Sequence, residues 1–466
     1  MITFVDRRHH VRSSHFLPEI QPSDMNRRSF LKTLAVSSAA ATFPSIVRAQ
    51  ALGLGDTTAP SVRLNIGCIG TGIQGRANLT NALANSSVRV VAVCDVDKKH
   101  REQAHRMVEE TYAREKRSGT YKGCAEYDDM RELLARPDID AVLIATPEHW
   151  HALNVIYAAR AGKHIYCEKP AGASIPETRA MLNAVQFAGV VCQIGSQQRS
   201  STDFLRVIDL TRGGYLGAIK RVRVGLPSDM NKRPAQAVPG MPEPVPPELD
   251  YETWLGPAGP LPYCKARVHY NWRWNFAFGG GRLTDWVGHH FDSAALAMRV
   301  SNMMPIAIRE AKARFLDDSP LYNTAADYSF EAHYANGIVI EVSSALREGV
   351  HIDGSEGSVY VNRGIVEYSA PHLRRIQIPT QRLSLSQSGP RGHMNDFVEC
   401  ALSGARPRAP MSDAHCVTAA AHLANVAFRA GRRELRFDPV VEQLVDAPDA
   451  VRYFQRTMRA PWTLDA

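Results

Sequence analysis

The chain has 466 residues, of which 44% are hydrophobic and 22% charged, the balance of an ordinary globular protein with enough length for two domains. Its formal net charge is +8, but residues 1–49 hold seven Lys/Arg and three Asp/Glu and therefore half of that charge. No run of five or more Lys/Arg occurs in the chain, which argues against nucleic acid as a partner.

The N-terminal region predicts an export signal. The stretch Asn26-Arg27-Arg28-Ser29-Phe30-Leu31-Lys32 precedes a mostly apolar run from Leu34 to Val47 and then Arg48-Ala49-Gln50. Paired arginines, a weakly apolar core and a small residue at the cleavage point are typical of a twin-arginine signal. The apolar run is shorter than the ~20 residues of a membrane span. We expect residues 1–49 to form the signal region, Met25 to be the true start, and the mature protein to be periplasmic or otherwise exported without a membrane span; a chance basic, apolar N-terminus is the alternative.

The eight cysteines have no repeating spacing, and no Cys-x-x-Cys occurs. Twin-arginine export carries folded proteins, so folding takes place in a reducing compartment, where disulfides are rare. We therefore expect free cysteines in the core, with Cys68 and Cys94 in buried strands.

Strands and helices alternate between residues 60 and 196. Short apolar segments predict strands at 62–69, 88–93, 141–145, 164–167 and 190–194. Longer segments predict helices at 98–116, 149–161 and 176–187. Continuously apolar strands between helices favour a doubly wound parallel sheet, as in α/β proteins.

Residues 197–466 have a different character. Prolines are frequent over 227–263, which predicts a long surface loop. The segments 328–334 and 338–342 flank Asn336-Gly337, a strong hairpin signal. Further strands are expected at 350–361 and 365–368, and helices near Asp285 and at 394–402 and 414–430. We predict a substrate-binding α+β domain with an open, mainly antiparallel sheet.

A glycine-rich turn follows the first strand and opens a helix. In Gly70-Thr71-Gly72-Ile73-Gln74-Gly75, the first glycine permits a tight turn, the second admits a pyrophosphate and the third allows the helix to pack on the strand. Asp95 ends the next strand and would accept ribose hydroxyls and repel a 2′-phosphate, which favours NAD over NADP. Asp97 is the alternative acid, and Lys98 and Lys99 leave NADP possible. Residues 60–196 are therefore predicted to be an NAD(P)-binding Rossmann domain.

Two polar clusters follow later strands, where the ligands of parallel sheets bind. They are Thr146-Pro147-Glu148-His149-Trp150-His151 and Glu168-Lys169-Pro170. A helix-starting turn with incidental histidines, and a surface lysine, are the alternatives. We expect cofactor contacts from Thr146, Pro147, His151, Glu168 and Lys169.

A third cluster lies in the second predicted domain. At 100° per residue, Asp285, His289 and Asp292 fall within about 60° on one helix face, whereas His290 points away. A capped helix start with a hydrogen-bonded histidine is one alternative. Zinc bound by His289 and His290 is another, but adjacent histidines diverge on a helix and no third ligand pattern occurs, so no metal is expected.

Taken together, the glycine turn, Glu168-Lys169-Pro170 and the Asp285-x-x-x-His289-x-x-Asp292 pattern resemble the Gfo/Idh/MocA oxidoreductase family. The resemblance covers nearly everything after Val62, includes the tail Arg459-Ala460-Pro461-Trp462, and is greatest with the exported twin-arginine branch.

The resemblance implies that Lys169, Asp285 and His289 form the catalytic group. It also implies sugar contacts from Gln197, Gln198 and Arg199. The Pro- and Trp-rich insertion with Trp254, Trp272, Arg273 and Trp274 departs from the smallest family members. Because apolar ring faces suit sugars, we expect Trp274 to contact the substrate together with Gln197, Arg199, Asp285 and His289.

The chemistry of these residues suits alcohol oxidation. A histidine with an ordinary pKa of ~6.5 can take the hydroxyl proton, Lys169 can hold the oxygen, and Asp285 can orient both. We expect an NAD(P)-dependent oxidoreductase acting on CH–OH groups of a sugar or polyol, with a tightly held cofactor because the envelope offers little free NAD.

Two other functions are considered. One is a redox-neutral glycoside hydrolase that uses NAD transiently through a keto intermediate, and the other is a nucleotide-loaded sugar-binding protein without turnover. A homo-oligomer formed through the open sheet is expected in each case.

Overall fold

The computed structural model of the chain describes residues 63–229, 241–316, 321–378 and 389–465. The leader and the expected start at Met25 lie outside these residues. None of the helices in the described ranges has the length and apolar character that crossing a membrane requires.

The first sheet contains six parallel strands in the order β3-β2-β1-β4-β5-β6. They are β1 (Leu64–Ile69), β2 (Val88–Cys94), β3 (Ala125–Tyr127), β4 (Ala141–Ile144), β5 (His164–Cys167) and β6 (Cys192–Ile194). This is the doubly wound order of dinucleotide-binding folds, with ligands expected at the carboxyl edge. The predicted parallel sheet is confirmed.

Helices cover both faces of the first sheet. One face packs against α2 (Ile73–Leu83), α3 (Lys98–Thr111) and, from far along the chain, α14 (Gly389–Ser403). The other face packs against α5 (Met130–Leu134), α6 (Glu148–Arg160) and α7 (Ile175–Ala188). The helical segment expected over 98–116 is present but is interrupted at Tyr112, which separates α3 from α4 (Ala113–Arg117). Tyr112 is buried, and its hydroxyl accepts a hydrogen bond from Val90 N.

The second sheet contains nine strands in the order β13-β12-β11-β7-β10-β9-β8-β14-β15, antiparallel except for the pair β7 and β10. The strands are β7 (Ile219–Gly225), β8 (Ala307–Arg314), β9 (Asp327–His333), β10 (Val339–Ser343), β11 (Gly349–Gly354), β12 (Gly357–Asn362), β13 (Ile365–Tyr368), β14 (Leu435–Asp438) and β15 (Gln443–Val445). The Asn336-Gly337 hairpin joins β9 to β10 as predicted. The segment 350–361 continues the antiparallel sheet as expected, but as two strands, because the chain turns at Ser355 and Glu356 before Gly357, whose φ is +140°.

Within the part of the chain that the structure describes, helices cover one face of the second sheet. They are α8 (Thr202–Arg212), α10 (Gly281–Trp286), α11 (Asp292–Ala297), α12 (Pro371–Arg375), α15 (Met411–Arg429) and α16 (Val451–Phe454). The opposite face carries surface ion pairs such as Arg221–Glu341 and Arg223–Asp353. The open, mainly antiparallel sheet is therefore confirmed, and its use by a second copy stays a prediction.

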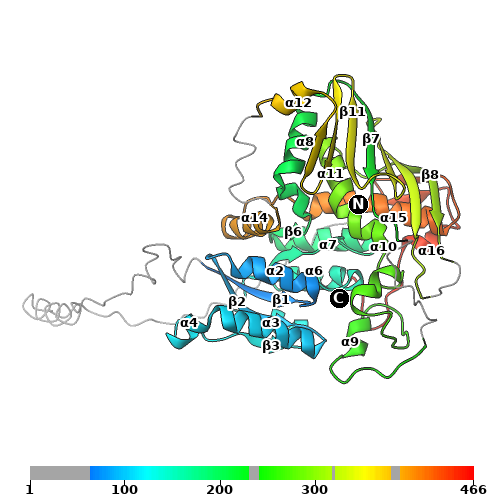
Figure 1. Cartoon of the computed structure of the whole chain (residues 1–466). Helices are drawn as coiled ribbons and strands as arrows, with labels where there is room; N and C mark the ends of the chain where they lie inside the picture. The colour runs from blue at the N-terminus through cyan, green and yellow to red at the C-terminus, as the bar shows by residue number, and fades with distance from the viewer. Residues whose placement is uncertain (1–62, 230–240, 317–320, 379–388, 466) are drawn as a thin grey trace, which may run out of the picture.

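The insertion, residues 241–275, packs beside the first sheet, although it follows β7 of the second. Leu249 forms a β-bridge with Asp97, and Asp250 N donates to Val96 O at 3.0 Å. The predicted surface loop is wrong in part, because this segment contains α9 (Tyr251–Leu255) and an apolar cluster of its own around Trp254. Figure 1 shows the first sheet in blue to cyan below the second in green to yellow, with α9 reaching down beside the first.

All eight cysteines are free, and six of them, including Cys68 and Cys94, are buried. Burial raises the pKa of the Cys68 thiol to about 12, which suppresses its reactive thiolate form. The expectation of free core cysteines is confirmed.

Candidate functional site

A cavity of about 380 Å³ lies between the carboxyl edge of the first sheet and the insertion. The sheet contributes the turns that follow β1, β2, β4 and β5. Among the predicted cofactor contacts, the lining includes Gly70, Gly72, Ile73, Gln74, Asp95, Thr146, Pro147, His151, Glu168 and Lys169. The insertion and the C-terminal tail supply the facing wall with Thr253, Trp254, His269, Tyr270, Trp272, Arg273 and Trp462.

The three glycines of the turn after β1 have different surroundings. A Cβ on Gly70 would lie 2.7 Å from Thr146 N, and a Cβ on Gly75 would lie 2.0 Å from Gly70 O. A Cβ on Gly72 would meet no atom within 4 Å, and the start of α2 beside it has no side-chain cap. The first and third glycines are therefore needed for packing, whereas the second leaves room for a phosphate at the helix N-terminus.

Asp95 is held at the cavity by the glycine turn. Its Oδ2 accepts hydrogen bonds from Thr71 N at 2.6 Å and Thr71 Oγ1 at 3.1 Å, so the buried Thr71 positions Asp95 rather than lining the cavity. Asp97 Oδ1 caps α3 by accepting from Lys99 N at 2.8 Å. The ammonium group of Lys99 pairs with Glu248 of the insertion. Asp95 and Asp97 both line the cavity, and both lysines that would favour NADP have acidic partners, since Lys98 Nζ lies 3.8 Å from Glu102 Oε1.

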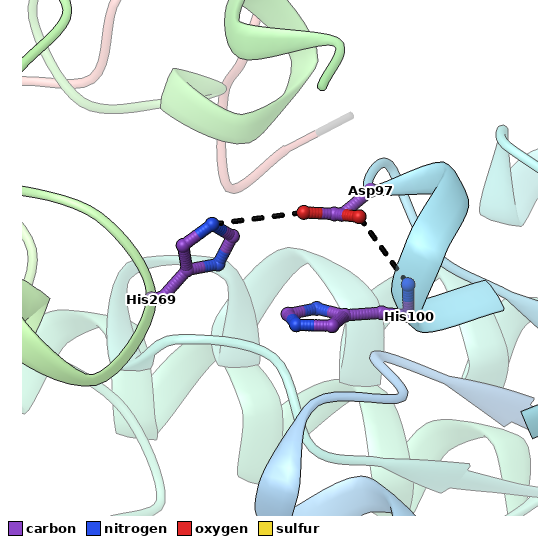
Figure 2. Close-up of side chains that lie close together, drawn as sticks. All are labelled: Asp97, His100 and His269. Atoms are coloured by element: carbon purple, nitrogen blue, oxygen red, sulfur yellow. Dashed lines mark hydrogen bonds and ion pairs between the residues drawn. The ribbon is translucent and has the colours of Figure 1, made fainter. Parts of the chain in front are cut away.

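Asp97 and His100 meet His269 of the insertion (Figure 2). His100 Nδ1 also lies 3.9 Å from Asp95 Oδ2. His269 Nε2 lies 3.6 Å from Asp97 Oδ2, and the rings of His100 and His269 meet edge to face with centroids 5.0 Å apart. The φ of His269 is +52°, a left-handed conformation that is costly for a non-glycine residue. The three side chains each offer a ligand atom within 4.8 Å of the others, a spacing that a cation could bridge.

The C-terminal tail closes the same end of the cavity. The Trp462 ring packs against Trp150 with centroids 4.9 Å apart, and the guanidinium of Arg131 lies 5.8 Å from the Trp462 ring. Sequence reasoning included this tail only in the family resemblance, and it missed Arg131 because the preceding β3 has only three residues.

Lys169 and Asp285 form a buried ion pair at the other end of the cavity. Lys169 Nζ lies 2.6 Å from Asp285 Oδ1, while Arg282 and Arg273 approach Asp285 Oδ2 to 3.3 and 3.6 Å. Burial raises the pKa of Asp285, but the charges of Lys169 and Arg273 outweigh it and leave the pKa well below the usual range. Asp285 is therefore ionised and fixes the Lys169 ammonium at the cavity wall.

His289 lies near Lys169 but does not line the cavity. The backbone of Gly288 packs on Lys169, since a Cβ there would lie 2.9 Å from Lys169 Cβ. His289 is buried, and its Nδ1 has no hydrogen-bond partner among the residues that the structure describes. Burial and the charge of Lys169 hold the pKa of His289 well below its ordinary value, so the imidazole is neutral and able to accept a proton.

The common helix face expected for Asp285, His289 and Asp292 is wrong. A π-helical turn, Val287–Phe291, separates α10 from α11 and holds more residues per turn than an α-helix, which rotates Asp292 away from the cavity. Asp292 instead accepts hydrogen bonds from Arg199 at 2.6 and 2.8 Å.

The sugar contact expected of Arg199 is corrected by the same pairing. Arg199 is 3% exposed and also donates to Asp413 Oδ2 at 2.8 Å, so its charge is satisfied inside the protein. Such a buried arginine needs carboxylate partners to offset its desolvation. The residue ties the start of α8 to α11 and α15 and has no contact with the cavity.

Gln197, Gln198 and Trp274 are likewise absent from the cavity lining within the described ranges. Gln197 Nε2 donates to Glu168 Oε1 at 3.0 Å, and Gln198 bonds to His290. Trp274 is 1% exposed and packs on Tyr322. Instead, Trp272 of the same insertion reaches the cavity, because the 3-10 turn over His269–Trp274 presents alternate rings to opposite sides.

The turns after β4 and β5 are joined by buried polar groups. His151 Nδ1 and Nε2 lie 2.7 Å from Pro170 O and 2.8 Å from Thr146 O. Glu168 accepts from Asn78 Nδ2 at 3.0 Å and Gln74 Nε2 at 3.1 Å, and burial raises the pKa of this carboxyl group. These bonds fix the cavity floor between the glycine turn and Lys169.

Fold and site together define a two-domain protein that binds a nicotinamide dinucleotide. Residues 64–196 match the family model described as oxidoreductase family, NAD-binding Rossmann fold, and residues 231–464 match the C-terminal alpha/beta domain of that family. The chain belongs to the Gfo/Idh/MocA oxidoreductase family. Residues 24–44 match the signal sequence of the twin-arginine translocation pathway, which confirms the predicted route of export.

Two curated relatives each match less than half of the chain. An uncharacterized oxidoreductase, YrbE, from Bacillus subtilis is 33% identical over 153 residues, or 32% of this chain and 40% of that protein. Glycosyl hydrolase family 109 protein 2 from Shewanella sp. (strain ANA-3) is 30% identical over 210 residues, or 42% of this chain and 45% of that protein. The matched part thus spans less than half the length of these relatives.

A solved structure of levoglucosan dehydrogenase with NADH and levoglucosan has a similar fold. The TM-score is 0.59 at 21% identity, with 80% of this chain and 99% of that chain covered.

Proposed function

We propose that the protein is a periplasmic NAD(P)-dependent oxidoreductase that acts on a CH–OH group of a sugar or polyol. The observation that carries this proposal is the Lys169–Asp285 pair at one end of a cavity whose other end is formed by the glycine turn and Asp95. The levoglucosan dehydrogenase of similar fold contains NADH and levoglucosan, which is in keeping with a carbohydrate substrate.

The cofactor supplies a nicotinamide ring that exchanges hydride with the carbinol carbon. Gly72, Asp95 and the start of α2 would hold the dinucleotide, because they offer open space, a ribose acceptor and uncapped N–H groups. Lys169 Nζ then donates to the substrate oxygen and stabilises its developing negative charge. Asp285 orients Lys169. His289 is neutral and does not line the cavity, so for it to accept the hydroxyl proton at Nδ1 the bound substrate has to reach past Lys169.

The walls of the cavity support a tightly held cofactor. The insertion reaches across to Asp97 through His269, and the tail places Trp462 on Trp150. A dinucleotide beneath these segments would dissociate slowly. After each hydride transfer, the bound cofactor would therefore have to be reoxidised or reduced again without leaving the protein. The proposed cycle oxidises one carbohydrate and reduces another.

The test is mass spectrometry of nucleotide released by denaturing the exported protein, followed by titration of the intact protein with sugars and polyols. We expect close to one nicotinamide dinucleotide per chain, and an absorbance change of the bound cofactor that a second carbohydrate reverses. Protein isolated without nucleotide, and binding NAD only weakly, would contradict the self-contained cycle.

A redox-neutral glycoside hydrolase is the second candidate. The relative from Shewanella, which is named as a family 109 glycosyl hydrolase, favours it. Release of an aglycone without net change of the cofactor would identify this activity in the same titration, whereas a reversible redox response would exclude it as the main reaction.

A further inference from the structure

The charges around the reacting end of the cavity do not balance. Lys169 is paired with Asp285, and Arg282 lies 3.2 Å from a second carboxylate, Asp229. Arg273, the third cation near Asp285, approaches it through Nε to 3.6 Å and pairs with no second carboxylate among the described residues. Within this group of five side chains one positive charge is left over. Burial raises the pKa of the two other carboxyl groups nearby, Glu168 and Glu148, and thereby disfavours the charged forms that would offset it.

Arg273 is held rigidly in position. Its guanidinium lies 3.9 Å from the ring centre of Tyr270 and 5.0 Å from that of Trp272, and one terminal nitrogen donates to Tyr270 O. Nε is buried, faces Asp285 and has no hydrogen-bond partner among the described residues, so the second terminal nitrogen is the donor that a ligand in the cavity would meet. A stacked guanidinium with unused donors is suited to bind a planar anionic group such as a carboxylate.

The dinucleotide itself does not supply an anionic group near Arg273. Its pyrophosphate belongs at Gly72 and the start of α2, and an oxidised nicotinamide ring is itself positively charged. The pKa of Asp285 is consistent with this excess of positive charge, because Lys169 and Arg273 lower it despite the burial of the carboxyl group.

We propose that the substrate is an acidic carbohydrate, a uronate or aldonate, whose carboxylate binds Arg273 while a hydroxyl group binds Lys169. The inference rests on the proposed function and adds the substrate class. The carboxylate takes no part in the redox step and serves to orient the sugar, so Arg273 determines specificity.

The test uses the nucleotide-loaded exported protein and matched substrates: glucuronate against glucose, galacturonate against galactose, and glucose 6-phosphate. We expect kcat/KM for the acids to exceed that for the neutral sugars by about 10–100-fold, the range of a hydrogen bond to a charged group. R273Q should remove this preference by slowing the acids more than the neutral sugars, and a smaller loss common to both would reflect the contact of Arg273 with Asp285. R267Q is the matched control, because Arg267 lies in the same insertion but bonds to Pro262 O outside the cavity lining.

Equal rates for acids and neutral sugars, an equal loss for both in R273Q, or a preference for the phosphate would overturn the inference. Binding of glucuronate is measured separately, by its effect on the fluorescence of the bound reduced cofactor. If glucuronate binds to the wild type and not to R273Q, yet no sugar is oxidised, the proposed function fails while Arg273 still binds the anion. If glucuronate does not bind at all, the inference about Arg273 is wrong.

Discussion

Replacing Lys169 by methionine removes the ammonium group and keeps most of the side-chain volume. In the wild type, Nζ lies 2.6 Å from Asp285 in a pair that is nearly buried. The substitution takes away the donor that we assign to the substrate oxygen, and it leaves the glycine turn and Asp95 intact. We therefore expect lost turnover with unchanged nucleotide content.

The structure sets the size of both effects. Loss of one donor to a developing oxyanion costs about 10²–10³-fold in kcat. Breaking a buried ion pair costs about 3–5 kcal/mol of stability. We expect about 3 kcal/mol here, because Arg282 and Arg273 remain 3.3 and 3.6 Å from Asp285 and offset part of its charge.

Single-turnover hydride transfer, followed through the absorbance of the bound nicotinamide, measures the first effect, and urea unfolding measures the second. Lys163 provides the matched control: it is a buried lysine whose Nζ donates to Arg136 O at 2.8 Å and Ile139 O at 2.9 Å, before β5 and away from the cavity. K163M should lose stability and keep its rate of hydride transfer. If K169M transferred hydride as fast as K163M, the assigned role of Lys169 would be refuted.

Three further predictions concern other residues of the site and its surroundings. H289Q should lower turnover ~10²–10⁴-fold. In the wild type, kcat/KM should stay level as pH falls and decline only below the ordinary histidine value of ~6.5, because the pKa of His289 is lowered. A decline centred above that value would exclude His289 as the base. D95A should weaken NAD binding and relax rejection of NADP in equilibrium titrations, and an unchanged preference would transfer the ribose contact to Asp97. R199M should destabilise the protein by about 3–5 kcal/mol in urea unfolding by leaving Asp292 buried without its partner, with KM unchanged; a raised KM at full stability would restore Arg199 as a substrate contact.

Local patterns predicted the parts of the molecule whose causes are local. The glycine turn could be predicted because the spacing of its three glycines meets steric requirements within a few residues. The Asn336-Gly337 hairpin could be predicted because its turn requires residues that accept positive φ. Strands β7, β8 and β14 were not anticipated, since charged residues on the open face interrupt their apolar pattern, as in the sequence of β8 from Ala307 to Arg314.

The misplaced residues depend on contacts between distant parts of the chain. Arg199 looked available for a ligand because its partners Asp292 and Asp413 lie 93 and 214 residues away. The helical-face argument assumed a regular α-helix and therefore missed the π-helical turn before Asp292. Trp272 and Trp274 could not be distinguished, because the 3-10 geometry that separates them is set by packing of the insertion on the nucleotide domain.

The cavity is lined by segments that lie far apart in the sequence. A dinucleotide lying in it would touch the turns of the first sheet, the insertion near His269 and the tail at Trp462 at the same time. A ligand that binds only the folded form stabilises it by about 4 kcal/mol at a thousand times its Kd. Loading would thus help to complete folding before transport, and a chain that had not captured its nucleotide would present a loosened insertion and tail to a machinery that accepts folded proteins.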